Sequence, residues 1–221
     1  MVASSPGRVK HPVQVVLFDY GGVLRGDGRE IWTAADAAAS LPPGTLWAAW
    51  HDIPEYRLSR EGAIDGVAFR AAILRALIPV AGDAETAEAA LATLEGRLAG
   101  LPPIDAEMRT LIDRLRAGRR VKLGLLSNAS RGFTERLRAR GVASLFDDVV
   151  VSADVGLAKP DPAIFRLAAE RLGVIPETCL MIDDQAQHVE GARAAGLRAQ
   201  LHEPTRLREL IAWLESEGAL P

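Results

Sequence analysis

The stretch Val13-Gln14-Val15-Val16-Leu17-Phe18-Asp19-Tyr20-Gly21-Gly22-Val23-Leu24 decides the fold, because it joins an apolar run to a carboxylate and two glycines. Residues 13–18 are mostly apolar and rich in valine, which predicts a strand covered on both faces, as in a parallel sheet. Ligands of open parallel sheets bind at the carboxyl ends of the strands. Asp19 ends this strand, and the glycines after it allow a close approach of the backbone to a ligand. Asp19 is therefore a candidate nucleophile or metal ligand, with the capping of a turn as the plainer alternative.

Composition and charge limit the classes of protein to consider. The 221 residues are 48% hydrophobic and 25% charged, which suits a sizeable core. The net charge is -3 and no lysine or arginine run occurs, which argues against a nucleic-acid partner. No apolar run approaches the roughly 20 residues that span a bilayer, and no hydrophobic signal core is present. The one cysteine fits a reducing compartment, so we expect a cytoplasmic protein without a membrane partner. The oligomeric state does not follow from the sequence.

Strand and helix patterns alternate after residue 101. Apolar runs at 121–126, 149–151, 179–182 and 197–201 predict strands. The segments between and after these runs carry apolar residues at helical spacing, such as Met108, Leu111, Ile112 and Leu115. This alternation predicts an α/β fold with a Rossmann-like, doubly wound parallel sheet.

Residues 25–100 have a different texture, rich in alanine and leucine and without strand patterns. Apolar residues from Phe69 to Leu77 predict a helix that is capped by Asp65 and ends before Pro79. A second such pattern runs from Ala87 to Leu98. We expect residues 1–24 and 101–221 to form the α/β core domain, and residues 25–100 to form a small all-helical domain inserted after the first strand.

Polar groups recur where the predicted strands end. Parallel strands place their carboxyl ends on one edge of the sheet, so these groups should converge there. Carboxylates suit an octahedral Mg²⁺, whereas a hydroxyl and a lysine suit phosphate oxygens. Each group alone has a plainer role as a helix cap or a surface charge. The groups at strand ends are Asp19, Ser127, Asn128, Asp183 and Asp184, and Lys159 joins them from a position just before a predicted helix start.

Four segments, in this order, resemble the motifs of the haloacid dehalogenase-like (HAD) hydrolase superfamily. They are Phe18-Asp19-Tyr20-Gly21-Gly22-Val23-Leu24, Leu125-Leu126-Ser127-Asn128, the stretch from Gly156 through Lys159-Pro160-Asp161-Pro162 to Phe165, and Met181-Ile182-Asp183-Asp184 with Val189 to Gly196. The resemblance spans nearly the whole chain. It implies that the insert is a helical cap domain of the first cap class, which closes over the site and sets specificity.

The resemblance also implies roles for the polar residues. Asp19 would be the nucleophile and a metal ligand. Ser127, Asn128 and Lys159 would bind the phosphoryl group, and Lys159 would also assist catalysis. The remaining Mg²⁺ ligands would be Asp183 and the backbone carbonyl of Gly21, with Asp184 either a ligand or a residue of the second shell.

Gly21 departs from the pattern of the resembled phosphatases, which usually carry a second Asp two residues after the nucleophile, although some members with glycine there resemble sugar-1-phosphate phosphatases. The second Asp exchanges protons with the leaving group and with water, a contribution typically worth about 10²–10⁴ in rate. Either another residue takes over the proton transfer, or the substrates have good leaving groups, or the activity is weak. Asp27 and His51 are candidate replacements, although a turn residue and a surface or tryptophan-packed histidine are the plainer interpretations. His188 stands where similar motifs often have Asn, and we expect it on a helix surface, with a place at the rim of the active site as the alternative. Cys179 is expected in the core.

The sequence thus predicts a Mg²⁺-dependent phosphatase that acts on a small phosphorylated metabolite, such as a sugar phosphate, through an aspartyl-phosphate on Asp19. One alternative is a metal-independent 2-haloacid dehalogenase in which Asp19 attacks carbon. Another is a weakly active or non-catalytic phosphate-binding protein. The pair Asp183-Asp184 fits a metal better than it fits the dehalogenase, and the identity of the substrate does not follow from the sequence.

Overall fold

Five parallel strands form the central sheet of the computed structural model, which describes residues 11–26, 28–100 and 102–220. The strand order is β3-β2-β1-β4-β5, so the first strand is central. Val15 of β1 pairs with Lys122 of β2 on one side and with Cys179 of β4 on the other. This order places the end of β1 in the middle of the sheet edge. The strands are β1 (Val15–Phe18), β2 (Lys122–Ser127), β3 (Asp148–Val151), β4 (Cys179–Asp183) and β5 (Arg198–Leu201).

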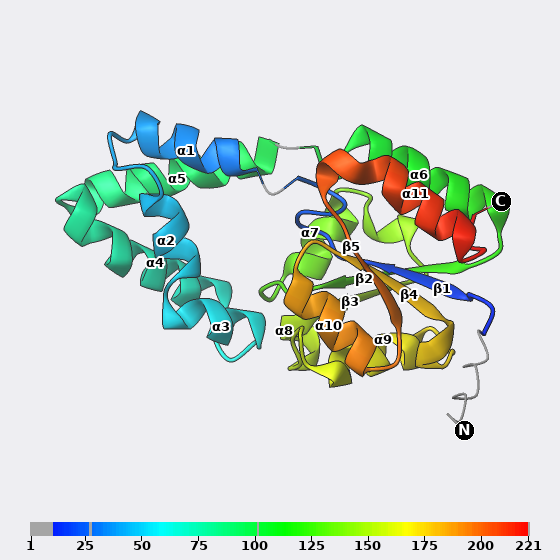
Figure 1. Cartoon of the computed structure of the whole chain (residues 1–221). Helices are drawn as coiled ribbons and strands as arrows, with labels where there is room; N and C mark the ends of the chain where they lie inside the picture. The colour runs from blue at the N-terminus through cyan, green and yellow to red at the C-terminus, as the bar shows by residue number, and fades with distance from the viewer. Residues whose placement is uncertain (1–10, 27, 101, 221) are drawn as a thin grey trace, which may run out of the picture.

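Helices cover both faces of the sheet, as the doubly wound prediction requires (Figure 1). One face packs on α6, α7 and α11 in a hydrophobic cluster that includes Phe18, Leu111, Leu137 and Leu214. The other face packs on α9 and α10. The predicted α/β fold is confirmed. The helices of the core are α6 (Ala106–Gly118), α7 (Phe133–Ala139), α8 (Ser152–Val155), α9 (Pro162–Arg171), α10 (Ala186–Ala194) and α11 (Leu207–Ser216), with short 3-10 turns at Ala143–Leu145, Pro176–Thr178 and Pro204–Arg206.

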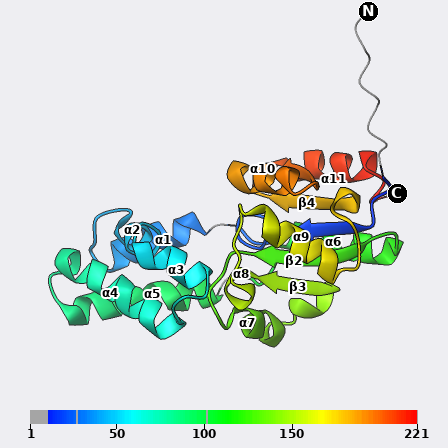
Figure 2. The same cartoon turned by 90° about the horizontal axis from the view of Figure 1, so that it is seen from below.

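The segment between β1 and α6 forms a separate helical lobe beside the sheet (Figure 2). Its helices bury their own hydrophobic cluster, which includes Trp32, Leu46, Ile73 and Leu91. The helices are α1 (Arg29–Ala38), α2 (Thr45–His51), α3 (Pro54–Arg60), α4 (Gly66–Ala81) and α5 (Ala84–Gly100). We retain the division into residues 1–24 with 101–221 and residues 25–100 as a proposal, since residues 1–10, 27 and 101 lie outside the described part. In that part, no helix is both long and apolar enough to cross a membrane.

Helix α4 begins as predicted but ends later than predicted. The side chain of Asp65 accepts a hydrogen bond from the Ala68 N–H at 2.8 Å, which caps the first turn. The helix then continues through Pro79 to Ala81, so the predicted end before Pro79 is wrong. Proline lacks one N–H donor, but near the end of a helix this removes one terminal hydrogen bond without breaking the turns before it.

The two segments that connect the lobe to the core are bonded to each other. The N–H of Asp105 donates to the carbonyl of Leu24 at 2.9 Å, and the N–H of Gly26 donates to Asp105 Oδ2 at 2.9 Å. The hydroxyl of Tyr20 also donates to the carbonyl of Pro103 at 2.8 Å. The chain therefore leaves and re-enters the core at one point beside the end of β1.

A second contact joins the lobe to the core at the turn between α3 and α4. Gly62 has a left-handed φ of 73°, and a Cβ atom at this position would lie 2.3 Å from the carbonyl oxygen of Ala153 in α8. Arg131, in the loop after β2, donates to the Gly62 carbonyl from two nitrogens at 3.0 and 3.2 Å. The turn thus rests on loops that follow the carboxyl ends of β2 and β3.

Candidate active site

Three carboxylates meet at the middle of this sheet edge. Asp19 follows β1 directly, and Asp183 and Asp184 stand at the end of the neighbouring strand β4, where Phe18 pairs with Ile182. Oxygen atoms of Asp19, Asp183 and Asp184 all lie within 4.8 Å of one another. The strand order therefore brings together the acids that the sequence placed at separate strand ends.

Lys159 links two of these carboxylates. Its Nζ lies 2.6 Å from Asp19 Oδ1 and 2.5 Å from Asp183 Oδ2, and its side chain is only 1% exposed. Burial acts to lower the pKa of Lys159, but the charges of Asp19 and Asp183 outweigh burial and raise this pKa above its ordinary value. The lysine is therefore a fixed positive charge between two acids.

Asn128 positions the backbone of Lys159. The Asn128 Nδ2 donates to the Lys159 carbonyl at 2.8 Å, and the Lys159 N–H donates to Asn128 Oδ1 at 2.9 Å. Because this reciprocal pair uses both polar atoms of the amide, a direct contact of Asn128 with phosphate stays a prediction. The preceding residue, Ser127, is buried at the end of β2 on the same sheet edge.

His188 was expected on a helix surface, and that prediction is wrong. The residue is 4% exposed, and its Nδ1 lies 2.9 Å from Asp183 Oδ1. A carboxylate only accepts hydrogen bonds, so the Nδ1 carries the proton and donates it. The Gln185 N–H donates to the same oxygen at 3.0 Å. Burial raises the pKa of Asp183, but the bonds from Lys159 and His188 outweigh burial and lower this pKa below its ordinary value.

Asp184 lies against the glycine turn that follows Asp19. Gly22 has a φ of 78°, and a Cβ atom there would lie 2.3 Å from Asp184 Oδ2, so glycine is required at this close approach. Asp184 Oδ1 is buried without a hydrogen-bond partner among the described residues. Burial, together with the charges of Asp19 and Asp183, raises the pKa of Asp184 to about 6. An orphaned carboxylate oxygen beside two other acids is a chemical fit for a divalent cation.

Asp19 is affected by the same excess of negative charge. Burial raises the pKa of Asp19 more than the charge of Lys159 lowers it, and Asp183 adds to the rise. A bound cation would favour the ionised form, because an opposite charge stabilises a carboxylate. The charges of these three acids therefore fit a bound cation.

Gly21 stands in open space at this edge. It is exposed, and a Cβ atom built on it would meet nothing within 4 Å. Its backbone lacks the left-handed φ of Gly22, so a larger side chain is sterically possible here. The role of the Gly21 carbonyl as a metal ligand stays a prediction.

The other candidates lie away from the carboxylates or outside the described residues. His51 stacks on the ring of Trp47 at a centroid distance of 3.9 Å within the helical lobe, as the tryptophan-packed interpretation predicts. Asp27 falls outside the described part of the chain. Cys179 is completely buried in β4, as predicted for a core residue.

Comparison with known proteins identifies the family of the chain. The family model described as haloacid dehalogenase-like hydrolase matches residues 13–196. A phosphatase of Mycobacterium tuberculosis is 45% identical over 85 residues, which are 38% of this chain and 39% of that protein. A phosphoserine phosphatase of Thermus thermophilus is 36% identical over 133 residues, 59% of this chain and 53% of that protein. The matches thus span about half the length of these relatives or less.

A solved structure extends the likeness to the fold. A HAD family enzyme of Bacteroides thetaiotaomicron, an Asp-to-Ala mutant crystallised with magnesium and inorganic phosphate, aligns with a TM-score of 0.63 at 19% identity. The alignment covers 86% of this chain and 94% of that one. The family model covers most of the chain, and its match includes Asp19, Lys159 and the acid pair of β4. The chain therefore belongs to the haloacid dehalogenase-like hydrolases.

Proposed function

We propose that the protein is a Mg²⁺-dependent phosphatase that hydrolyses a small phosphorylated metabolite through an aspartyl-phosphate on Asp19. The observation that carries this proposal is the cluster of Asp19, Asp183 and Asp184, whose oxygens lie within 4.8 Å of one another. One oxygen of the cluster, Asp184 Oδ1, has no hydrogen-bond partner among the described residues. The phosphatase names of the curated relatives support the same reaction class. Sugar phosphates are one class of substrate to test, and a cytoplasmic location is part of the proposal.

The chain's own residues account for the first half of the reaction. A carboxylate oxygen of Asp19 attacks phosphorus, the bond from phosphorus to the ester oxygen breaks, and the alcohol leaves with a proton taken from solvent. Lys159 lies beside the attacking carboxylate and stabilises the negative charge that gathers on the phosphoryl oxygens. Ser127, on the same edge, would donate to another of these oxygens.

In the second half, water attacks the phosphorus of the aspartyl-phosphate, releases inorganic phosphate and regenerates Asp19. Mg²⁺, held by Asp19, Asp183 and Asp184, would offset the repulsion between these carboxylates and the phosphate. His188 and Gln185 hold Asp183 Oδ1 from one side while Lys159 holds Oδ2 from the other, so this acid cannot rotate freely. The helical lobe would cover the substrate and exclude bulk water.

The test is hydrolysis of p-nitrophenyl phosphate with Mg²⁺, with EDTA, and by the variant Asp19→Asn. We expect turnover only in the wild type with Mg²⁺, because the amide cannot attack phosphorus and the acids repel phosphate without a cation. Asp113→Asn is the matched control, since Asp113 pairs with Arg109 on the exposed side of α6 and should keep full activity.

Two outcomes would replace the proposal. Release of chloride from 2-chloropropionate without metal would favour the dehalogenase. Binding of phosphate esters without turnover across aryl, sugar and acyl phosphates would favour the phosphate-binding protein.

A further inference from the structure

Three arginines gather where the helical lobe meets the core. Arg60 is the last residue of α3 and lies two positions before Gly62, whose backbone rests on Ala153. Arg131 donates to the Gly62 carbonyl, so its guanidinium lies at the same junction. Arg136 of α7 lies near Arg60. Burial lowers the pKa of Arg136 most, and the positive charge of Arg60 lowers this pKa further. We call Arg60, Arg131 and Arg136 the junction arginines.

The junction arginines have no acidic partner within 4 Å in the described ranges, 11–26, 28–100 and 102–220. Their acidic neighbours are engaged elsewhere. Glu61, next to Arg60, accepts two hydrogen bonds from Arg57 at 2.7 and 2.8 Å. Glu135, next to Arg136, pairs with Arg138. Like charges held together without a counter-ion cost free energy unless an anion joins them.

Arg60 is also held in place. Its guanidinium carbon lies 4.5 Å from the ring centroid of Tyr56 and 5.9 Å from that of Phe69. Its Nε is buried and has no hydrogen-bond partner among the described residues. A guanidinium oriented in this way is suited to a planar or tetrahedral anion.

Aromatic contacts tie the junction to the nucleophile. Arg136 stacks over Phe133 at 5.4 Å, and Phe133 packs edge-on against Tyr20 at 5.2 Å. Tyr20 follows Asp19 directly in the chain. The turn of Gly62 rests on loops after β2 and β3, so the junction arginines lie along the same sheet edge as the carboxylates.

We propose that the junction arginines bind a second anionic group of the substrate, so that the preferred substrates are phosphate esters with an additional carboxylate or phosphate. The carboxylate cluster repels such a group, whereas the junction offers it three guanidinium charges that no described carboxylate neutralises within 4 Å. This inference rests on the proposed phosphatase function and assigns selectivity to the contact between lobe and core.

The test compares substrates that differ only in the second anion. 3-Phosphoglycerate and glycerol 3-phosphate differ in a carboxylate, and fructose 1,6-bisphosphate and fructose 6-phosphate differ in a phosphate. We expect kcat/KM to be about 10- to 100-fold higher for the doubly anionic member of at least one pair, the range expected for a charge-assisted hydrogen bond. The pair that discriminates identifies the second anion.

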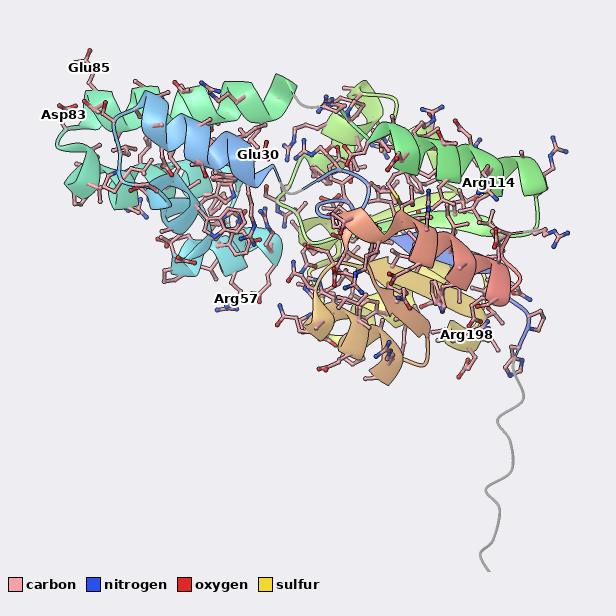
Figure 3. The ribbon with its side chains drawn as sticks, turned by 45° about the horizontal axis from the view of Figure 1, so that its top comes forward. Glu30, Arg57, Asp83, Glu85, Arg114 and Arg198 are labelled. Carbon is pink, nitrogen blue, oxygen red and sulfur yellow. The ribbon has the colours of Figure 1, made fainter. Side chains whose placement is uncertain are left out.

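Arg60→Gln should remove most of this preference, and it should do so by raising KM for the doubly anionic substrate. Arg60→Lys should restore part of the preference, because it returns the charge without the planar donors. Arg114→Gln is the matched control, since Arg114 lies on α6 at a distance from the lobe (Figure 3).

Equal kcat/KM values within both pairs would overturn the inference, and so would an equal loss of kcat/KM for both members of a pair in Arg60→Gln. Turnover of p-nitrophenyl phosphate would still support the phosphatase in either case. Absence of all turnover would overturn the phosphatase alone. In that case, calorimetric binding of 3-phosphoglycerate to wild type and Arg60→Gln decides the role of the arginines, and equal affinities would refute it.

Discussion

At the residue scale, the site depends on which atoms each side chain has left to offer. Lys159 is shared between Asp19 and Asp183, and Asp183 is bonded on both oxygens. Asp184 has one buried oxygen without a hydrogen-bond partner in the part of the chain that the structure describes, and Gly21 has no side chain. The site therefore has strong electrostatic groups and lacks a proton donor at the position beside the nucleophile.

Gly21→Asp should supply that proton donor. A Cβ atom at this position meets nothing within 4 Å, so the side chain fits without displacing a neighbour. Poor leaving groups need protonation more than p-nitrophenolate does, so we expect kcat/KM to rise at least about tenfold on glycerol 2-phosphate and less on p-nitrophenyl phosphate. Gly21→Asn is the control of similar size that cannot transfer the proton. Equal gains on the two substrates would show that residue 21 does not reach the leaving group.

The sequence predicted the identity of the clustered acids but not how they are held. The polar residues Asp19, Ser127-Asn128 and Asp183-Asp184 at the strand ends were enough to predict the cluster, because parallel strands place their carboxyl ends on one edge of the sheet. His188 was wrongly placed on a helix surface, because a histidine five residues after an acid has no distinctive spacing. Its bond to Asp183 depends on α10 starting at Ala186, and helix boundaries are the least reliable part of such a prediction.

At the element scale, local sequence signals predicted the start of helix α4 correctly and its end wrongly. Asp65 caps α4 because its carboxylate satisfies a free N–H of the first turn, a requirement that is visible in sequence. Pro79 did not stop the helix, because the turns before it keep their bonds and Leu77 is fully buried in the lobe. The close approach of Gly62 to Ala153 joins residues 91 positions apart and has no local signal.

Gly62→Ala tests that contact. Alanine at a left-handed φ costs about 1 kcal/mol, and its Cβ would lie 2.3 Å from the Ala153 carbonyl oxygen, so the turn must move off α8. Gly44→Ala is the matched control, because Gly44 has a φ of 87° with nothing within 4 Å of a Cβ atom. We expect urea unfolding to report a loss of about 1 kcal/mol for Gly44→Ala and a larger loss for Gly62→Ala. Only Gly62→Ala should also lower kcat/KM, and equal losses in the two variants would contradict this.

At the scale of the whole molecule, the two sheet faces and the lobe have separate hydrophobic clusters. Composition and periodicity predict this division, because the sequence of the lobe lacks strand patterns, whereas strand and helix patterns alternate in the sequence of the core. The placement of the lobe against the sheet edge depends on a few backbone contacts between distant residues, and the sequence pattern carries no trace of them.

The accessibility of the Cys179 thiol can be used to measure the unfolding of the core. It is completely buried, and burial raises the pKa of its thiol to about 12 from an ordinary value of 9.0. The folded state therefore favours the protonated thiol, and this contribution to stability is complete below pH 9 and is lost as the pH rises from about 9 towards 12. At pH 8 we expect a disulfide reagent such as DTNB to label Cys179 only after unfolding, in step with the urea transition. Labelling of the native protein at the rate of a free thiol would contradict a closed core.

The bond between Leu24 and Asp105 has a consequence for how such a protein can change over time. The segment between these residues leaves the core and returns to it at one hydrogen-bonded point. The length and sequence of this segment therefore do not affect the register of the sheet. We therefore expect insertions, deletions or a different helical module in this segment to leave the strand order and the carboxylate cluster unchanged. The α/β core can then stay constant among related proteins while the helical lobe diverges.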